Sequence, residues 1–347
     1  MKREALLYDK LEKDKVQCKV CMKRCIIADG KRGFCNTRKN EGGKLYTLIY
    51  GDIASGWPDT IEKKPLYHFY PGSYAYSIGT LGCNFRCKHC QNWDISHADP
   101  ESGTRRGTEY VPPEKLINLA KANRCQGVAF TYNEPTIWFE YTLDCSKLAK
   151  ENNLYTAYVT NGYITPEALD IIGPYLDAFR VDVKGFGGKF YPEVACVKNW
   201  EPVLDSTIRA KNKWNMHVEV VTLVVPGYND DPEELKNLAR WIVENLGIDT
   251  PWHVTQFMPH LDLSHVPPTP IETLERAYDI GKKEGLHFVY IGNVLGHPKE
   301  STYCYNCGKL LIKRLGFSAL SFEIEDGECK FCGAKIPITG EYFGGRE

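Results

Sequence analysis

Cysteine spacing is the strongest chemical feature of this sequence. Eleven of its 14 cysteines fall into three short clusters, and only Cys125, Cys145 and Cys196 stand alone. Fourteen cysteines in 347 residues are too sparse for a small disulfide scaffold, and closely spaced thiols in a reducing compartment usually bind metal. The sequence therefore predicts three separate metal sites.

The central cluster consists of Cys83, Cys87 and Cys90, separated by three and two residues. Three thiolates cannot complete a four-coordinate zinc site without a further ligand, but they can hold three irons of a 4Fe–4S cluster. The fourth iron is then open to a small-molecule ligand. The alternative is a zinc site that a neighbouring side chain such as His89 completes.

The last cluster has two Cys-x2-Cys pairs that are 21 residues apart, and Gly308 and Gly333 each follow a pair. This spacing is typical of a zinc ribbon or a rubredoxin-like single-iron site. The residues between the pairs are not markedly basic, which favours a structural site over a nucleic-acid-reading ribbon. The expected ligands are Cys304, Cys307, Cys329 and Cys332.

Four thiols near the N-terminus suit either a closed zinc site or an auxiliary 4Fe–4S cluster. The basic residues around them would offset thiolate charge, and equally could bind an anionic substrate. We favour the closed structural metal site, because charge compensation alone accounts for the basic residues. The thiols are Cys18, Cys21, Cys25 and Cys35, and the basic residues are Lys19, Lys23, Arg24, Lys31, Arg32 and Arg38.

The elements that must position these ligands alternate between strands and helices, which predicts an α/β fold with a parallel sheet. Six or seven units fit a complete or partial TIM-type barrel, with (β/α)6 expected, and a doubly wound open sheet is the alternative. We expect strands at 74–81, 127–132, 154–159, 177–183, 217–224, 252–257 and 287–291, and helices at 112–122, 135–151, 231–246 and 270–285.

The N-terminal and C-terminal segments lack regular apolar patterns, so we expect bound metal to stabilise them. We therefore predict a four-cysteine extension over residues 1–60, a barrel over 61–298 and a ribbon over 299–347.

The segment from Cys83 to Cys90 resembles the radical S-adenosylmethionine (SAM) enzymes. The resemblance implies that SAM binds the open iron of a 4Fe–4S cluster. One electron then cleaves SAM to methionine and a 5′-deoxyadenosyl radical, which abstracts hydrogen from a substrate. It also implies that His89 lies near the SAM adenine, while the cofactor carries the difficult chemistry.

Further residues resemble those of glycyl-radical activating enzymes, and most follow an expected strand, where βα barrels collect their catalytic groups. Val159 departs from the family pattern of Asp-Thr-Asn-Gly and puts its monovalent-cation site in doubt. The resemblance assigns SAM contacts to Glu134, Asn161, Asp182, Lys184 and His260.

The order of motifs is similar to that in the radical SAM member of the AmmeMemoRadiSam system, which is related to pyruvate formate-lyase-activating enzyme. This implies an oxygen-sensitive oxidoreductase with a ferredoxin- or flavodoxin-type electron donor. Its substrate would be a glycyl residue of a partner protein, or a small molecule or peptide handled with the AmmeMemoRadiSam partner proteins. The rival reading is a non-catalytic regulatory protein in which zinc staples all three cysteine clusters.

Composition excludes several other classes of protein. The chain has 43 Lys and Arg against 44 Asp and Glu, a net charge of −1, which disfavours general binding to nucleic acid or an anionic membrane. No run approaches the ~18 apolar residues of a transmembrane helix, and the charged start lacks the apolar core of a signal peptide. We expect a cytoplasmic protein.

Overall fold

The computed structural model describes residues 1–100 and 107–344. The chain divides into two compact units. The first unit comprises Met1–Pro58, Ala75–Phe179 and Ala195–Met216, and the second comprises Asp59–Tyr74, Arg180–Val194 and the chain from His217 onward.

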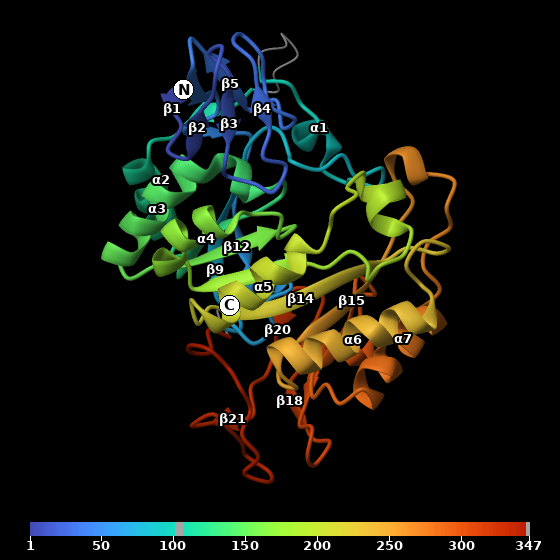
Figure 1. The fold of residues 1–347 in the computed structure, drawn as a ribbon. Coiled ribbons are helices and arrows are strands. Elements are labelled where there is room, and N and C mark those ends of the chain that lie inside the picture. The colour runs from blue at the N-terminus through green and yellow to red at the C-terminus, as the bar shows by residue number, and fades with distance from the viewer. Residues whose placement is uncertain (101–106, 345–347) are drawn as a thin grey trace. The chain divides into compact units, whose positions relative to one another are not determined.

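The first unit is built on parallel strands: β11 (Gly127–Phe130) pairs with both β9 (Tyr74–Gly79) and β12 (Tyr155–Thr160). All four residues of β11 are buried, as in a parallel strand covered on both faces. Helices α2 (Pro113–Ala122) and α3 (Phe139–Glu151) provide the crossovers that parallel pairing requires and lie side by side (Figure 1). The expected parallel core is confirmed.

The N-terminal part of this unit is an antiparallel β structure, where the sequence showed little strand periodicity. Its strands order as β1-β6-β5 and β2-β3-β4 and have only two to four residues each, too short to display an alternating pattern. Apolar side chains such as Val16 and Leu45 are nevertheless fully buried between them. The strands are β1 (Arg3–Glu4), β2 (Tyr8–Lys10), β3 (Val16–Cys18), β4 (Ile26–Ile27), β5 (Arg38–Glu41) and β6 (Lys44–Thr47).

The first unit contains further strands and helices. They are β7 (Asp52–Ile53), β8 (Ser55–Thr60), α1 (Trp93–Ser96), β10 (Glu109–Tyr110), η2 (Pro135–Trp138), α4 (Pro166–Ile172), η3 (Gly173–Tyr175) and α5 (Pro202–Asn212). Strand β13 (Ala178–Asp182) continues the chain from the first unit into the second.

The second unit contains another parallel set, in which β15 (Trp252–Gln256) pairs with β14 (His217–Val224) and β16 (Val289–Gly292). Helices α6 (Pro232–Leu246) and α7 (Ile271–Lys283) lie side by side in Figure 1. Asp231 caps α6, since its carboxylate accepts from the backbone N–H groups of Glu233 and Glu234, both at 3.0 Å.

The end of the chain adds short antiparallel hairpins to the second unit. Leu311, Ile312 and Ile336 from this region share one hydrophobic cluster with Phe288 and Tyr290 near β16. The hairpin strands are β17 (Thr302–Tyr303), β18 (Leu310–Ile312), β19 (Arg314–Leu315), β20 (Ser318–Ala319), β21 (Ile324–Glu325) and β22 (Glu328–Cys329). The minor helical turns are η1 (Ile61–Lys63), η4 (Phe190–Ala195), η5 (Leu261–Leu263) and η6 (Pro298–Glu300).

A fully buried carboxylate, that of Glu219 on β14, also anchors the second unit. It accepts hydrogen bonds from His217 Nε2 at 2.9 Å, from His253 Nε2 at 2.6 Å and from the His68 backbone N–H at 2.7 Å. Burial alone would raise the pKa of Glu219, but the histidine hydrogen bonds outweigh it and hold that pKa well below its usual range.

None of the helices in the described ranges is both long enough and apolar enough to cross a membrane.

We expect Glu219→Gln to lower the free energy of unfolding at pH 7 by about 2 kcal/mol, the scale of a charged hydrogen bond. The folded-state pKa lies below the unfolded one, so the carboxylate stabilises the fold above about pH 4.5 and this contribution disappears as the pH falls further. Thermal melts at pH 7 and pH 4 measure the effect. Glu233→Gln, on a side chain that is 75% exposed, is the matched control, and an equal loss in both variants would contradict the assignment.

Candidate active site and metal centres

The central cysteine loop begins where β9 ends at Gly79. Asn133 holds its first residues, because Asn133 Nδ2 donates to the carbonyls of Thr80 at 3.0 Å and Gly82 at 2.7 Å. Gly82 has φ +88°, a conformation that favours glycine. Its added Cβ would also collide with Thr37 and with the Cys35 carbonyl. The backbone thus enters the loop along a path that only glycine permits.

Cys83, Cys87 and Cys90 all lie in this loop and are partly exposed. The Phe85 backbone N–H donates to Cys83 Sγ at 3.4 Å, and the Cys90 N–H donates to the Cys87 carbonyl at 3.2 Å. Burial raises the pKa of the Cys83 thiol well above its usual value, and the nearby Glu134 carboxylate raises it further. A bound cation would favour the thiolate form of Cys83.

Glu134 stands between β11 and η2 with its side chain 1% exposed. Its Oε1 accepts from the Thr136 N–H at 3.0 Å and from Thr160 Oγ1 at 2.7 Å, and its Oε2 accepts from the Asn161 N–H at 2.7 Å. Burial raises the pKa of Glu134, and these hydrogen bonds oppose the rise. The carboxylate therefore joins the ends of β11 and β12 and caps η2.

Asn161 extends this network toward the cysteine loop. Its Nδ2 donates to Asn84 Oδ1 at 2.7 Å, and its Oδ1 accepts from the Tyr163 N–H at 3.0 Å. Asn84 Oδ1 also lies 3.8 Å from Cys83 Sγ. The structure thus brings together Cys83, Asn84, Glu134 and Asn161.

Asp182 and Lys184 belong to the second unit and pair with each other. Lys184 Nζ donates to Asp182 Oδ2 at 3.1 Å, and Arg180 forms an ion pair with the same carboxylate. Burial would raise the pKa of Asp182, but these two cations outweigh it and lower that pKa.

The two candidate histidines also lie in different units. His89 is buried in the first unit, whereas His260 lies directly before η5 in the second. Their contacts with SAM, like those of Asp182 and Lys184, stay predictions.

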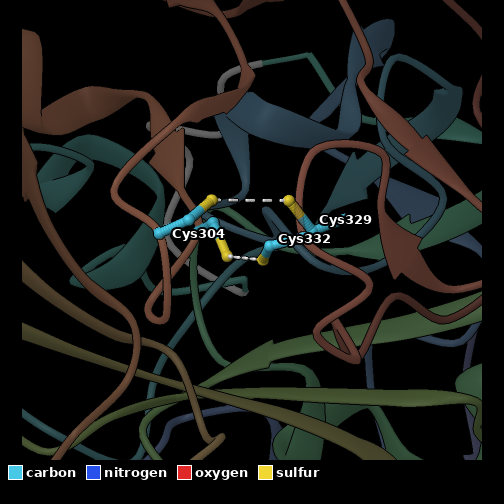
Figure 2. Close-up of side chains that lie close together, drawn as sticks. Cys304, Cys329 and Cys332 are labelled. Atoms are coloured by element: carbon cyan, nitrogen blue, oxygen red, sulfur yellow. Dashed lines mark hydrogen bonds between the residues drawn. The ribbon is translucent and has the colours of Figure 1, made fainter.

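The C-terminal thiols form a compact four-ligand group whose Sγ atoms all lie within 4.8 Å of one another. The Sγ atoms of Cys304 and Cys332 lie 3.6 Å apart (Figure 2). Those of Cys307 and Cys329 lie 3.8 Å apart. A tetrahedron with metal–sulfur bonds of about 2.3 Å spaces its sulfur atoms by about 3.8 Å. The geometry therefore fits a single metal ion, and the thiols do not specify which one.

The four N-terminal thiols line one pocket, together with Arg38, Asn84 and Ile137. Burial raises the pKa of Cys18 to about 11, although Arg38 opposes the rise, and burial also raises the pKa values of Cys21 and Cys25. The backbone N–H of Val20 donates to Cys18. Such N–H donors stabilise thiolates in metal sites.

Most of the basic residues near this pocket have a partner other than a thiol, while Arg38 and Lys23 still lower the pKa values of Cys18 and Cys25. Arg38 is 2% exposed and binds Glu140, itself 1% exposed, through two hydrogen bonds of 2.9 and 2.8 Å. Three of the other basic side chains also pair with carboxylates, in the ion pairs Lys19–Asp9, Arg24–Glu167 and Arg32–Asp99. Lys23 lies over the Phe34 ring at 4.0 Å.

Three further residues, Asn84, Asn133 and Glu140, have no signature of their own in the sequence. Asn84 directly follows Cys83 and Asn133 directly precedes Glu134, and these positions are the local signal that points to them. Glu140 is 102 residues from Arg38, and nothing local in the sequence connects the two.

Residues 77–242 match the family model described as the radical SAM superfamily. These bounds contain the central cysteines, Glu134, Asn161, Asp182 and Lys184, whereas His260 and both flanking cysteine groups lie outside them.

The chain is 45% identical over 339 residues to an uncharacterized protein of Methanocaldococcus jannaschii, covering 97% of this chain and 99% of that protein. It is also 26% identical over 174 residues to the pyruvate formate-lyase-activating enzyme of Clostridium pasteurianum, covering 48% of this chain and 67% of that enzyme. Identity to the 4-hydroxyphenylacetate decarboxylase activating enzyme of Clostridium scatologenes is 23% over 166 residues, or 46% of this chain and 53% of that enzyme.

We expect Cys304→Ala to remove one metal ion per chain and to lower the melting temperature, since a closed four-thiolate site contributes folding energy directly. Elemental analysis and thermal melts measure both effects. Cys196→Ser, at an exposed and isolated cysteine, is the control and should retain both the metal and the melting temperature. Full metal content in Cys304→Ala would exclude the ribbon as a metal site.

Proposed function

Because this chain belongs to the radical SAM superfamily, we propose that it cleaves SAM reductively and uses the resulting 5′-deoxyadenosyl radical to abstract a hydrogen atom from a substrate. The observation that carries this proposal is the loop of three cysteines at the carboxyl end of β9, beside the Glu134–Asn161 network.

The donor set of this loop fits a 4Fe–4S cluster. Among the described residues, no three ligand atoms that include one of these thiols all lie within 4.8 Å of one another, whereas a single tetrahedral ion needs sulfur atoms about 3.8 Å apart. Cys83, Cys87 and Cys90 would ligate three irons, and the bound cluster supplies the electron for SAM cleavage.

Glu134 and Asn161 would bind and orient SAM. A carboxylate has about four acceptor positions, and three donors already hold Glu134 in place. A remaining lone pair is available to the SAM ammonium, and the fixed orientation lowers the entropy lost on binding. His89 would contact the adenine, and Asp182, Lys184 and His260 would complete the SAM contacts within a partial (β/α)6 barrel.

The relatives that are activating enzymes favour a glycyl residue of a partner protein as the hydrogen donor. The second candidate is a small molecule or peptide handled by an AmmeMemoRadiSam system, to which the order of motifs is similar. In either case the reductant would be a ferredoxin- or flavodoxin-type donor in an anaerobic cytoplasm.

We expect Cys87→Ala to abolish formation of 5′-deoxyadenosine from SAM and dithionite, because the central cluster loses a ligand. Anaerobic turnover followed by chromatography measures the product, with Cys196→Ser as the control. Product formation at the parent rate would overturn the proposed function, as would a colourless parent protein that contains about three zinc ions and no acid-labile sulfide, which is the result expected of the zinc-stapled regulatory protein.

We expect Glu134→Gln to weaken SAM binding by more than about 1 kcal/mol, the scale of one hydrogen bond, while the cluster still assembles. Titrating SAM against the EPR signal of the reduced cluster measures the affinity, and a thermal melt measures the loss of the helix cap. Glu167→Gln, at a partly exposed glutamate of α4, is the control. A lower melting temperature with unchanged SAM affinity would restrict Glu134 to a structural role.

A further inference from the structure

The four N-terminal thiols are spaced more widely than the four thiols of the C-terminal ribbon. The described residues contain one group of three or more ligand atoms within 4.8 Å of one another, and it is the ribbon. Cys18, Cys21, Cys25 and Cys35 share a pocket without reaching that spacing. A single tetrahedral ion needs sulfur atoms about 3.8 Å apart, whereas a group with several metal atoms holds its thiolates farther apart.

The pocket also contains a buried polar atom without a partner. Asn84 is 1% exposed and lines the pocket, and its Nδ2 has no hydrogen-bond partner within the described residues. Its Oδ1 already accepts from Asn161 at 2.7 Å, which fixes the orientation of the amide. A buried amide donor without an acceptor is costly, and sulfur atoms of a bound cluster would supply the acceptor.

The loop that carries the central cysteines packs directly against the N-terminal cysteine segment. Gly82 closely approaches the Cys35 carbonyl. Arg86 donates from one guanidinium nitrogen to the Cys83 carbonyl at 2.7 Å and from the other to the Phe34 carbonyl at 2.9 Å. The two cysteine sites are therefore neighbours within the first unit.

We propose that the N-terminal pocket binds a second 4Fe–4S cluster through Cys18, Cys21, Cys25 and Cys35, with Asn84 Nδ2 donating to a cluster sulfur. Four thiolates complete such a cluster, so it has no open iron and does not bind SAM. The assignment concerns a different site from the proposed function and does not depend on SAM cleavage.

Acid-labile sulfide provides the test, because a single zinc or iron ion at any of the three sites contains none. The full chain is reconstituted anaerobically with iron and sulfide in two variants. Cys83→Ala/Cys87→Ala/Cys90→Ala should lose about half of the wild-type sulfide, and Cys21→Ala/Cys25→Ala should lose the other half. Cys196→Ser should lose none.

The result that overturns the proposal is a central triple variant that is folded and free of sulfide, with one zinc or iron at the N-terminal site. If the triple variant does not fold, the sulfide contents of the wild type and of Cys21→Ala/Cys25→Ala are compared instead. Equal sulfide contents in these two proteins overturn the proposal. Sulfide retained in the triple variant supports the second cluster even if the wild type fails to cleave SAM, so the two proposals fail separately.

Asn84→Asp in the triple variant tests the hydrogen bond. It replaces a donor with a negative charge at nearly the same shape, so the midpoint potential of the remaining cluster should become more negative. EPR-monitored redox titration measures the potential, and an unchanged midpoint would overturn the role of Asn84.

Discussion

A buried thiolate must have its charge matched, and this constraint governs how the first unit is built. Burial raises the pKa values of Cys18, Cys21 and Cys83, so without a cation each thiol would keep its proton. Arg38 lowers the pKa of Cys18 but is itself paired with Glu140, and Glu134 raises the pKa of Cys83. A metal bound to these thiols would therefore couple the stability of this unit to its metal content.

The Glu134–Asn161–Asn84 chain of hydrogen bonds shows how a sheet edge becomes a precise site. Parallel strands deliver their carboxyl ends to one edge, but the side chains there still need fixed orientations. Glu134 takes its orientation from Thr136 in η2, from Thr160 at the end of β12 and from Asn161 directly after it. Because every donor in the chain is backbone or a short side chain, little rotational freedom is left to be lost when a ligand binds.

The strands were predictable because they are short runs rich in β-branched and aromatic residues: the range 217–224 is β14, and 252–257 is β15 with one residue fewer. The expected helix over 135–151 is instead η2 followed by α3, because the Glu134 cap and Pro135 start a tight turn before the α-helix. The N-terminal strands escaped prediction because two to four residues cannot express a period. The Arg38–Glu140 pair escaped because its partners meet only in the folded chain.

Cysteine thiols occur in two different environments in this chain, the C-terminal ribbon and the N-terminal pocket. In the ribbon, Cys307 and Cys332 are exposed and the four sulfur atoms are spaced for one ion. Cys304 and Cys329 belong to the hydrophobic cluster around Tyr290, so a metal bound there would stabilise the second unit. The N-terminal thiols share a pocket with Asn84, whose neighbour in the chain is Cys83. The spacing of cysteines in a sequence indicates how many metal ligands a site has. The burial of those cysteines and the residues around them determine whether a metal group bound there could influence catalysis.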